Sequence, residues 1–230
     1  MDIHVGTSGF SYSEWKGSFY PEKFPNSEML RYYGERLGTV EINNTFYRMP
    51  KKEMLEKWPE QVPADFTFVL KASQRITHMK RLKDTGADVG FFFENAAALG
   101  DKLGPVLFQL PPYFRKEVAR LEEFLGNLPA GQRAAFEFRH ESWNDPDVYN
   151  VLRAHNVAVC IADTDEETWP FVPTADWGYL RLRGTDYQPA ELADWRKRVA
   201  DQDWGSAYVF FKHEDAGRGP ALAAEFIKLL

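Results

Sequence analysis

Cysteine is almost absent from this chain of 230 residues, which contains only Cys160. A single cysteine excludes an internal disulfide, and the apolar run 157–162 around it predicts a buried, unreactive thiol. We therefore expect a reducing, cytoplasmic environment for the protein.

Long hydrophobic runs and basic clusters are also missing. No stretch approaches the ~18 apolar residues of a membrane span, and the opening residues 1–10 lack the charged and apolar regions of a signal peptide. The net charge is −6 and no block of Lys or Arg occurs, which argues against general adhesion to nucleic acid or to anionic membranes. The expected partner is therefore a small molecule rather than a membrane or a nucleic acid, and the oligomeric state stays open.

Short runs rich in β-branched and aromatic residues recur along the chain, at residues 3–6, 39–43, 67–71, 106–110, 134–138, 157–163, 178–183 and 207–212. Strands separated by helix-length segments pair in parallel through crossover helices. Eight such units in a chain of this length predict one domain over residues 1–230, an α/β fold with a single (β/α)8 TIM-type barrel of parallel strands. An open doubly wound sheet is the alternative.

Capping residues and helical spacing mark the segments between these runs. Asp145 before Pro146 predicts a helix toward His155, and Gln188-Pro189 and Gly219-Pro220 open later helices in a similar manner. Residues 115–125 carry one apolar stripe. Two further helices are expected between the third and fourth strands, near 77–83 and 92–103.

Charged and amide side chains occur where the predicted strands finish. Because side chains alternate along a strand, Glu137 and Arg139 share a face that excludes Phe138. Helices cover the outside of a barrel, where an unpaired charge would cost several kcal/mol, so these groups should face the barrel axis. The expected set at the carboxyl-terminal rim is Glu41, Asn43, Lys71, Gln109, Glu137, Arg139, Asp163, Arg181, Arg183 and Lys212.

This set holds five cations and three carboxylates, so positive charge is in excess. One interpretation is a closed structural network, with Glu137–Arg139 and Asp163–Arg181 neutralising each other. The other is an anionic guest such as a phosphate, a carboxylate or a nucleotide. In that case Arg181→Ala should weaken anion binding by roughly 1.5–3 kcal/mol, and the loss of one crowded cation could improve folding.

Aromatic residues follow several strand ends and suit the stacking of a sugar ring or a base; they are Phe10, Tyr12, Trp15, Phe46, Tyr47, Tyr113, Phe114 and Trp143. Tyr47 and Trp143 are the two that we expect to contact a ligand. His78 is either a loop-borne acid or base or an ordinary loop histidine. Too few histidines reach the rim for a transition-metal site, so no metal and no cofactor is expected.

Several segments together resemble the YecE-like family, a domain of unknown function with the number 72. They are residues 5–10, 40–43, 46–47, 71–73, 76–78, 107–112, 137–140 and 179–184, with Trp15, Trp143 and Asp163. The resemblance covers nearly the whole chain and implies a TIM-type barrel, with distant kinship to sugar-isomerase-like and endonuclease-like barrels, but no activity. Many relatives have an Asn-Asn pair where this chain has Lys212-His213.

Three functions remain open. The first is binding of, or action on, an anionic ring-containing small molecule such as a sugar phosphate or nucleotide derivative, with catalysis by Glu41, Lys71, Glu137 and Asp163. The other rim residues, with Tyr47 and Trp143, would then hold the substrate. The second is a metal-assisted phosphoester hydrolase acting on nucleic acid, with ligands Glu41, Glu137, Asp163 and His213. The third is a non-catalytic metabolite-binding protein that uses the same pocket.

Overall fold

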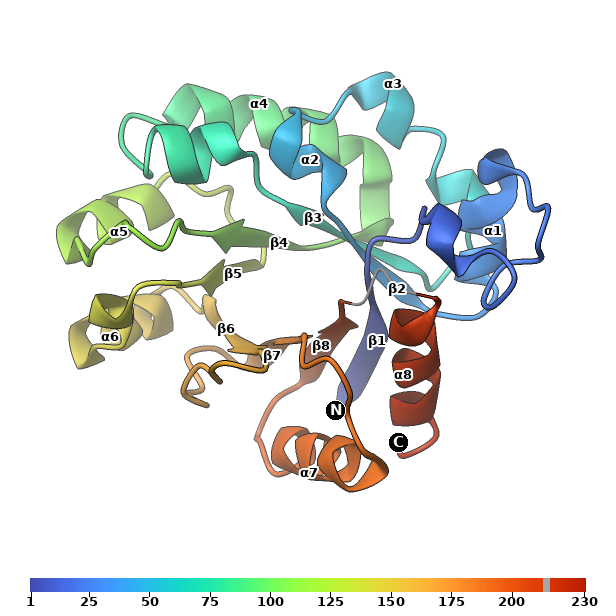
Figure 1. Ribbon diagram of the computed structural model, residues 1–230. Coiled ribbons are helices and arrows are strands. Elements are labelled where there is room, and N and C mark those ends of the chain that lie inside the picture. The colour runs from blue at the N-terminus through green and yellow to red at the C-terminus, as the bar shows by residue number, and fades with distance from the viewer. Residues whose placement is uncertain (213–215) are drawn as a thin grey trace.

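Eight parallel strands form a closed barrel in the order in which they occur in the chain, in a computed structural model that describes residues 1–212 and 216–230 (Figure 1). The strands are β1 (Asp2–Ser8), β2 (Thr39–Ile42), β3 (Thr67–Lys71), β4 (Leu103–Gln109), β5 (Ala134–Glu137), β6 (Ala158–Asp163), β7 (Trp177–Leu182) and β8 (Ser206–Phe211). β1 closes the barrel by pairing with both β2 and β8. The predicted (β/α)8 TIM-type barrel is confirmed, and the open sheet is excluded.

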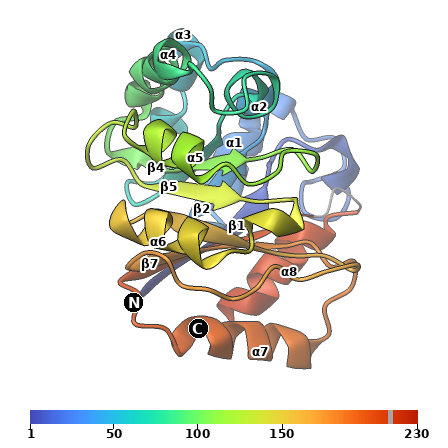
Figure 2. The ribbon, with the colours of Figure 1, turned by 90° about the vertical axis from the view of Figure 1, so that its left-hand side faces the viewer.

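Helices surround the barrel, and the side view shows α5, α6 and α7 lying along its outer face (Figure 2). The α-helices are α1 (Met29–Gly34), α2 (Asn44–Tyr47), α3 (Lys52–Leu55), α4 (Gly86–Ala96), α5 (Val118–Leu125), α6 (Pro146–Ala154), α7 (Pro189–Ala200) and α8 (Arg218–Ile227). Shorter helical turns are η1 (Ser13–Trp15), η2 (Asn26–Glu28), η3 (Pro59–Gln61), η4 (Arg75–Met79), η5 (Ala97–Lys102) and η6 (Glu141–Trp143). Among the described residues, no helix has the length and apolar character that crossing a membrane requires.

The segment between β3 and β4 differs most from its prediction. The helix expected at 77–83 is a short π-helical turn, η4, and the chain then reverses through Arg81 and Leu82 with positive φ. The second helix, α4, begins at Gly86 rather than at residue 92. β4 also starts earlier, at Leu103, because Gly104-Pro105 belongs to the strand although such a pair usually marks a turn.

Two apolar layers follow from the alternation of side chains along the strands. One face of each strand packs against the helices, as Phe68, Phe108 and Leu180 do. The other face fills the barrel with residues such as Leu107, Tyr179 and Phe210. Cys160 belongs to this inner layer, which confirms the prediction of a buried cysteine, and burial raises the pKa of its thiol.

The cap of α6 can be tested by substitution. The Asp145 carboxylate accepts a hydrogen bond from the Asp147 backbone N–H at 2.9 Å, and Asp145 also pairs with Lys116. We expect Asp145→Ala to lower the free energy of unfolding by about 1–2 kcal/mol because the first turn loses its cap. Chemical denaturation measures the change, with Asp147→Ala as the matched control, which should cost less. Equal losses in the two variants would contradict the capping role.

Candidate functional site

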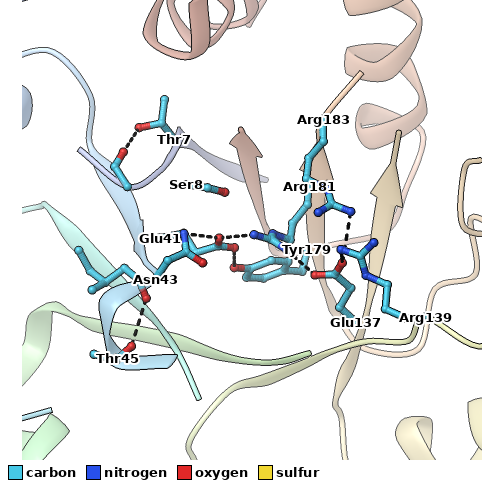
Figure 3. A network of polar contacts seen from close by, with 12 residues as sticks. Thr7, Ser8, Glu41, Asn43, Thr45, Glu137, Arg139, Tyr179, Arg181 and Arg183 are labelled. Atoms are coloured by element: carbon cyan, nitrogen blue, oxygen red, sulfur yellow. Dashed lines mark hydrogen bonds and ion pairs between the residues drawn. The ribbon is translucent and has the colours of Figure 1, made fainter. Parts of the chain in front are cut away.

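A buried ionic centre lies inside the barrel near the carboxyl ends of its strands (Figure 3). The Arg181 guanidinium lies between two carboxylates, with Nη1 2.5 Å from Glu137 Oε2 and Nη2 2.8 Å from Glu41 Oε1. Arg181 is 2% exposed, and both glutamates are fully buried. Charges so deeply buried persist only when they are paired and hydrogen-bonded, so the three side chains form one unit that joins β2, β5 and β7.

Further polar groups surround this centre. Below Arg181, the Tyr179 hydroxyl donates to Glu41 Oε2 at 2.6 Å. Arg139 Nη2 contacts Glu137 Oε1, and Arg183 Nη2 approaches the same oxygen at 3.6 Å. Glu137 is therefore approached by three guanidinium groups and Glu41 by one, so cationic charge is concentrated on the side of β5 and β7.

The three arginines determine the ionisation of Glu137. Burial alone would raise the pKa of this carboxyl, but Arg181, Arg139 and Arg183 outweigh it and hold the pKa at about 2. Glu137 is therefore a permanent anion at neutral pH. A carboxylate with so low a pKa is a poor general base, and its clear role in the geometry is to position the guanidinium groups around it.

Above the ionic centre a cavity of about 550 Å³ opens to solvent. Its walls differ in character. The chain that follows β1, β2 and β3 contributes aromatic rings, whereas β5 and β7 contribute guanidinium groups. The lining residues are Tyr12, Asn43, Asn44, Phe46, Tyr47, Lys71, Gln74, His78, Gln109, Arg139, Arg181, Arg183 and Lys212. None of these described lining residues is a carboxylate.

Eight of the expected site residues line this cavity: Asn43, Tyr47, Lys71, Gln109, Arg139, Arg181, Arg183 and Lys212. Glu41 and Glu137 lie beneath it, covered by Arg181, rather than in its wall. The alternation of side chains thus gives the correct face for Glu41, Lys71, Glu137 and Arg181. Alternation does not indicate depth along the barrel axis, so it does not show that Glu41 and Glu137 lie too deep to line the cavity.

Asp163 does not belong to this group, and its predicted position is wrong. On β6 the inward residues are Cys160 and Ala162, so Asp163 points to the outer face. There it accepts a hydrogen bond from the Tyr187 hydroxyl at 2.5 Å and contacts the Thr168 hydroxyl. The Asp163–Arg181 pair considered from the sequence does not form.

Trp143 is also misplaced by the prediction. It is fully buried outside the barrel, stacked on Phe138 at 4.8 Å between ring centroids, and its Nε1 donates to the Phe114 carbonyl oxygen at 2.6 Å. Since Phe138 faces the helices, the ring that packs on it cannot reach the cavity. Trp143 holds the β5–α6 connection in place, whereas Tyr12 and Phe46 line the cavity beside the expected Tyr47.

The structure adds site residues to those predicted from the sequence. Asn44 and Gln74 line the cavity, and Tyr179 supports Glu41 from below. Tyr179 could have been found, because it alternates with Arg181 on the same strand face. Asn44 is the first residue of α2 and Gln74 is the N-cap of η4, and in segments this short no periodic pattern indicates the direction of a side chain.

Metal ligands are not gathered at the rim in the part of the chain that the structure describes. There, no three His, Cys, Asp or Glu side chains are placed to hold a metal ion. Of the ligands considered for a hydrolase, Glu41 and Glu137 are bound to Arg181, Asp163 faces outward, and His213 lies outside the described residues.

The fold and the site together define a (β/α)8 barrel protein with an arginine-centred ionic core beneath a cation-rich cavity. Its sequence matches the family model "Protein of unknown function DUF72" over residues 4–230, and the chain belongs to this family. The family predicted from the sequence is thereby confirmed.

Relatives and solved structures agree with this assignment. The chain is 25% identical over 273 residues to "UPF0759 protein YunF" of Bacillus subtilis, covering 99% of this chain and 94% of that protein. It is 30% identical to "UPF0759 protein YecE" of Escherichia coli, over 60% of this chain and 48% of that protein. A DUF72 family protein from Thermotoga maritima superposes with a TM-score of 0.87 at 28% identity, covering 100% of this chain and 99% of the other. A methyltransferase from Methanosarcina mazei, at 10% identity and a TM-score of 0.52, covering 98% of this chain and 92% of the other, shares the fold alone.

Proposed function

We propose that the cavity at the carboxyl end of the barrel binds a small, ring-containing anion such as a sugar phosphate or a nucleotide derivative. The observation that carries this proposal is the balance of charge. Leaving Lys212 aside, Lys71, Arg139, Arg181 and Arg183 face two carboxylates, Glu41 and Glu137, so four cations against two anions leave an excess of two. A bound anion would neutralise this excess.

Arg139 and Arg183 are the groups best placed to grip the anion. Their side chains are 23% and 15% exposed, so both reach solvent, whereas Arg181 is occupied by its two glutamates. Burial lowers the pKa of Arg183, and the charges of Arg181 and Arg139 add to that effect against the pull of Glu137. An anion placed between two such crowded guanidinium groups relieves their repulsion and accepts forked hydrogen bonds from both.

The aromatic wall accounts for the ring in the proposed ligand. Phe46 and Tyr47 follow β2 and Tyr12 follows β1, on the side of the barrel away from β5 and β7. A sugar or base can lie against these rings while its phosphate reaches the arginines, and Asn43 and Gln109 supply amides for its hydroxyl or ring nitrogen atoms. A volume of about 550 Å³ accommodates a molecule of this size.

A thermal-shift comparison tests the proposal. AMP and ribose 5-phosphate should raise the melting temperature of the protein, whereas adenosine and ribose should not, because only the phosphates engage the arginines. Arg183→Met should weaken AMP binding roughly 10-fold or more, as expected for the loss of a charge-assisted hydrogen bond. Arg31→Met, on the exposed side of α1, is the matched control and should bind normally.

Two results would contradict the proposal. One is that no anion of the panel shifts the wild-type protein. The other is that every anion shifts Arg183→Met as much as the wild type, in which case the arginines form a structural ion network only.

A further inference from the structure

Lys71 differs from the other cations of the cavity in having no ionic partner. Its Nζ makes no hydrogen bond, and no carboxylate lies within 4 Å of it, among the residues that the structure describes. Instead Nζ lies 4.2 Å from the centroid of the Phe46 ring. Lys71 is only 8% exposed, yet it lines the cavity. An ammonium group in such a place is poorly solvated, which is an arrangement typical of reactive lysines.

The position of Lys71 is fixed by its surroundings. It is the last residue of β3, and the Thr45 hydroxyl donates to its backbone carbonyl oxygen at 2.7 Å. The short helix α2 that contains Thr45 also supplies Phe46, so one turn of chain holds both the backbone and the side chain of the lysine. The amine is therefore directed into the cavity by a rigid support.

Charged groups of four elements surround Lys71, and burial together with these charges lowers the pKa of its amine. Burial lowers the pKa of the amine most, Arg181 of β7 lowers it further, and Lys212 after β8 acts in the same direction. Glu137 of β5 and Glu41 of β2 oppose them, and the resulting pKa is about 8 instead of the usual 10.5. At pH 7 this makes the neutral amine roughly 300-fold more abundant than in an ordinary lysine.

His78 of η4 supplies a group that can carry protons beside this amine. Its ring packs edge-on against the same Phe46 ring, with centroids 4.9 Å apart, and it lines the same cavity. Nδ1 is engaged by the Thr77 hydroxyl at 2.9 Å, so Nε2 is the nitrogen left for a ligand. Burial and the charge of Lys71 lower the pKa of the imidazole, which leaves it neutral and able to accept a proton at neutral pH.

From this arrangement we infer that Lys71 is a nucleophile that forms an imine with an aldehyde or ketone group of the ligand, with His78 transferring the protons. The inference rests on the proposed function, because the anion held by Arg139 and Arg183 brings the carbonyl group to the amine. Its substrate class is an anionic, ring-containing carbonyl compound or a phosphorylated sugar in its open-chain form.

The reaction balances without an oxidant or a reductant. The Lys71 ammonium first gives a proton to His78, the freed lone pair of Nζ forms a bond to the carbonyl carbon, and His78 passes that proton to the carbonyl oxygen. His78 accepts a proton from nitrogen and returns it to the resulting hydroxyl group, which leaves as water. A carbon–nitrogen double bond replaces the carbon–oxygen double bond, so carbonyl compound and lysine ammonium give a protonated imine and one water molecule.

Pyridoxal 5′-phosphate is a suitable probe because it combines an aldehyde, an aromatic ring and a phosphate. Reduction with borohydride fixes any imine as a stable adduct, and peptide mass spectrometry locates it. At pH 7 Lys71 should be labelled at least 10-fold faster than the exposed Lys197 of α7. The rate at Lys71 should rise with pH and level off above about 8, where its amine is already neutral.

Two variants test the roles of Lys71 and His78 separately, and one analogue measures anion binding without imine formation. Lys71→Arg should retain the positive charge and lose the fast labelling, and His78→Gln should slow labelling of Lys71 about 10-fold or more. Pyridoxine 5′-phosphate, with an alcohol in place of the aldehyde, reports anion binding alone through the melting temperature. Labelling of His78→Gln at the wild-type rate would overturn the role of His78.

Labelling of Lys71 no faster than of Lys197 would overturn the inference as a whole. In that event pyridoxine 5′-phosphate separates the two proposals. If it raises the melting temperature, the anion site stands and only the imine chemistry fails. If it does not, the anion site fails as well.

Discussion

Arg181→Met is expected to lower the free energy of unfolding by about 3–5 kcal/mol, the cost of removing one partner from a buried ionic network. Arg181 bonds both Glu41 and Glu137, and neither carboxylate is exposed. Glu137 keeps Arg139, but Glu41 keeps only polar neighbours such as the Tyr179 hydroxyl. For a chain of this length the melting temperature should fall by roughly 6–20 °C, measured by calorimetry.

This expected loss is the opposite of the expectation drawn from the sequence, in which removing Arg181 relieves crowded cations and could improve folding. The structure removes the reason for that expectation, because the Arg181 guanidinium is paired with a carboxylate on both sides. Arg31→Met, at an exposed position, should change stability by less than about 0.5 kcal/mol. Adding Glu41→Gln to Arg181→Met should restore part of the loss. A melting temperature of Arg181→Met within about 2 °C of wild type would contradict the network.

Acid should lower the free energy of unfolding because it protonates Glu137. The pKa of this carboxyl is about 2 in the folded protein against 4.5 as its ordinary value. A lowered pKa means that its contribution is complete above pH 4.5 and is lost as the pH falls from 4.5 toward 2. The difference corresponds to about 3 kcal/mol. Denaturant unfolding at pH 6 and pH 3 should therefore show a larger loss in the wild type than in Glu137→Gln.

The exposed Glu122 of α5 provides the control, since Glu122→Gln should follow the wild type at both pH values. Other carboxylates also titrate over this range, so the informative quantity is the difference between the two proteins. Equal loss of stability in wild type and Glu137→Gln would show that the arginines do not depress the pKa of Glu137.

Much of the barrel could be predicted because its signals are local. β3 was expected at 67–71 and is found at Thr67–Lys71, since a β-branched and aromatic run there ends in a charged residue. α6 begins at Pro146 behind its capping Asp145, as the sequence indicates. The segment from residue 77 to 92 was predicted poorly, because the positive φ angles of Arg81, Leu82 and Asp84 have no glycine to indicate them.

The site was predictable to the extent that side-chain alternation fixes direction. Arg181 and Glu137 were assigned to the barrel interior on this basis, and they bond there. Asp163 was assigned inward because it is charged, although alternation with the buried Cys160 places it on the outer face. How deep a side chain lies in the barrel depends on packing between strands. The sequence of a single strand therefore could not predict that Arg181 covers Glu41 and Glu137.

The most direct measurement is a crystal structure of the protein with AMP at saturating concentration. The phosphate should lie between the guanidinium groups of Arg139 and Arg183, with the base or ribose against Phe46 or Tyr47 and Arg181 still bonded to its two glutamates. A phosphate bound elsewhere on the molecule, or a cavity that stays free of AMP, would contradict an anion site at the carboxyl end of the barrel.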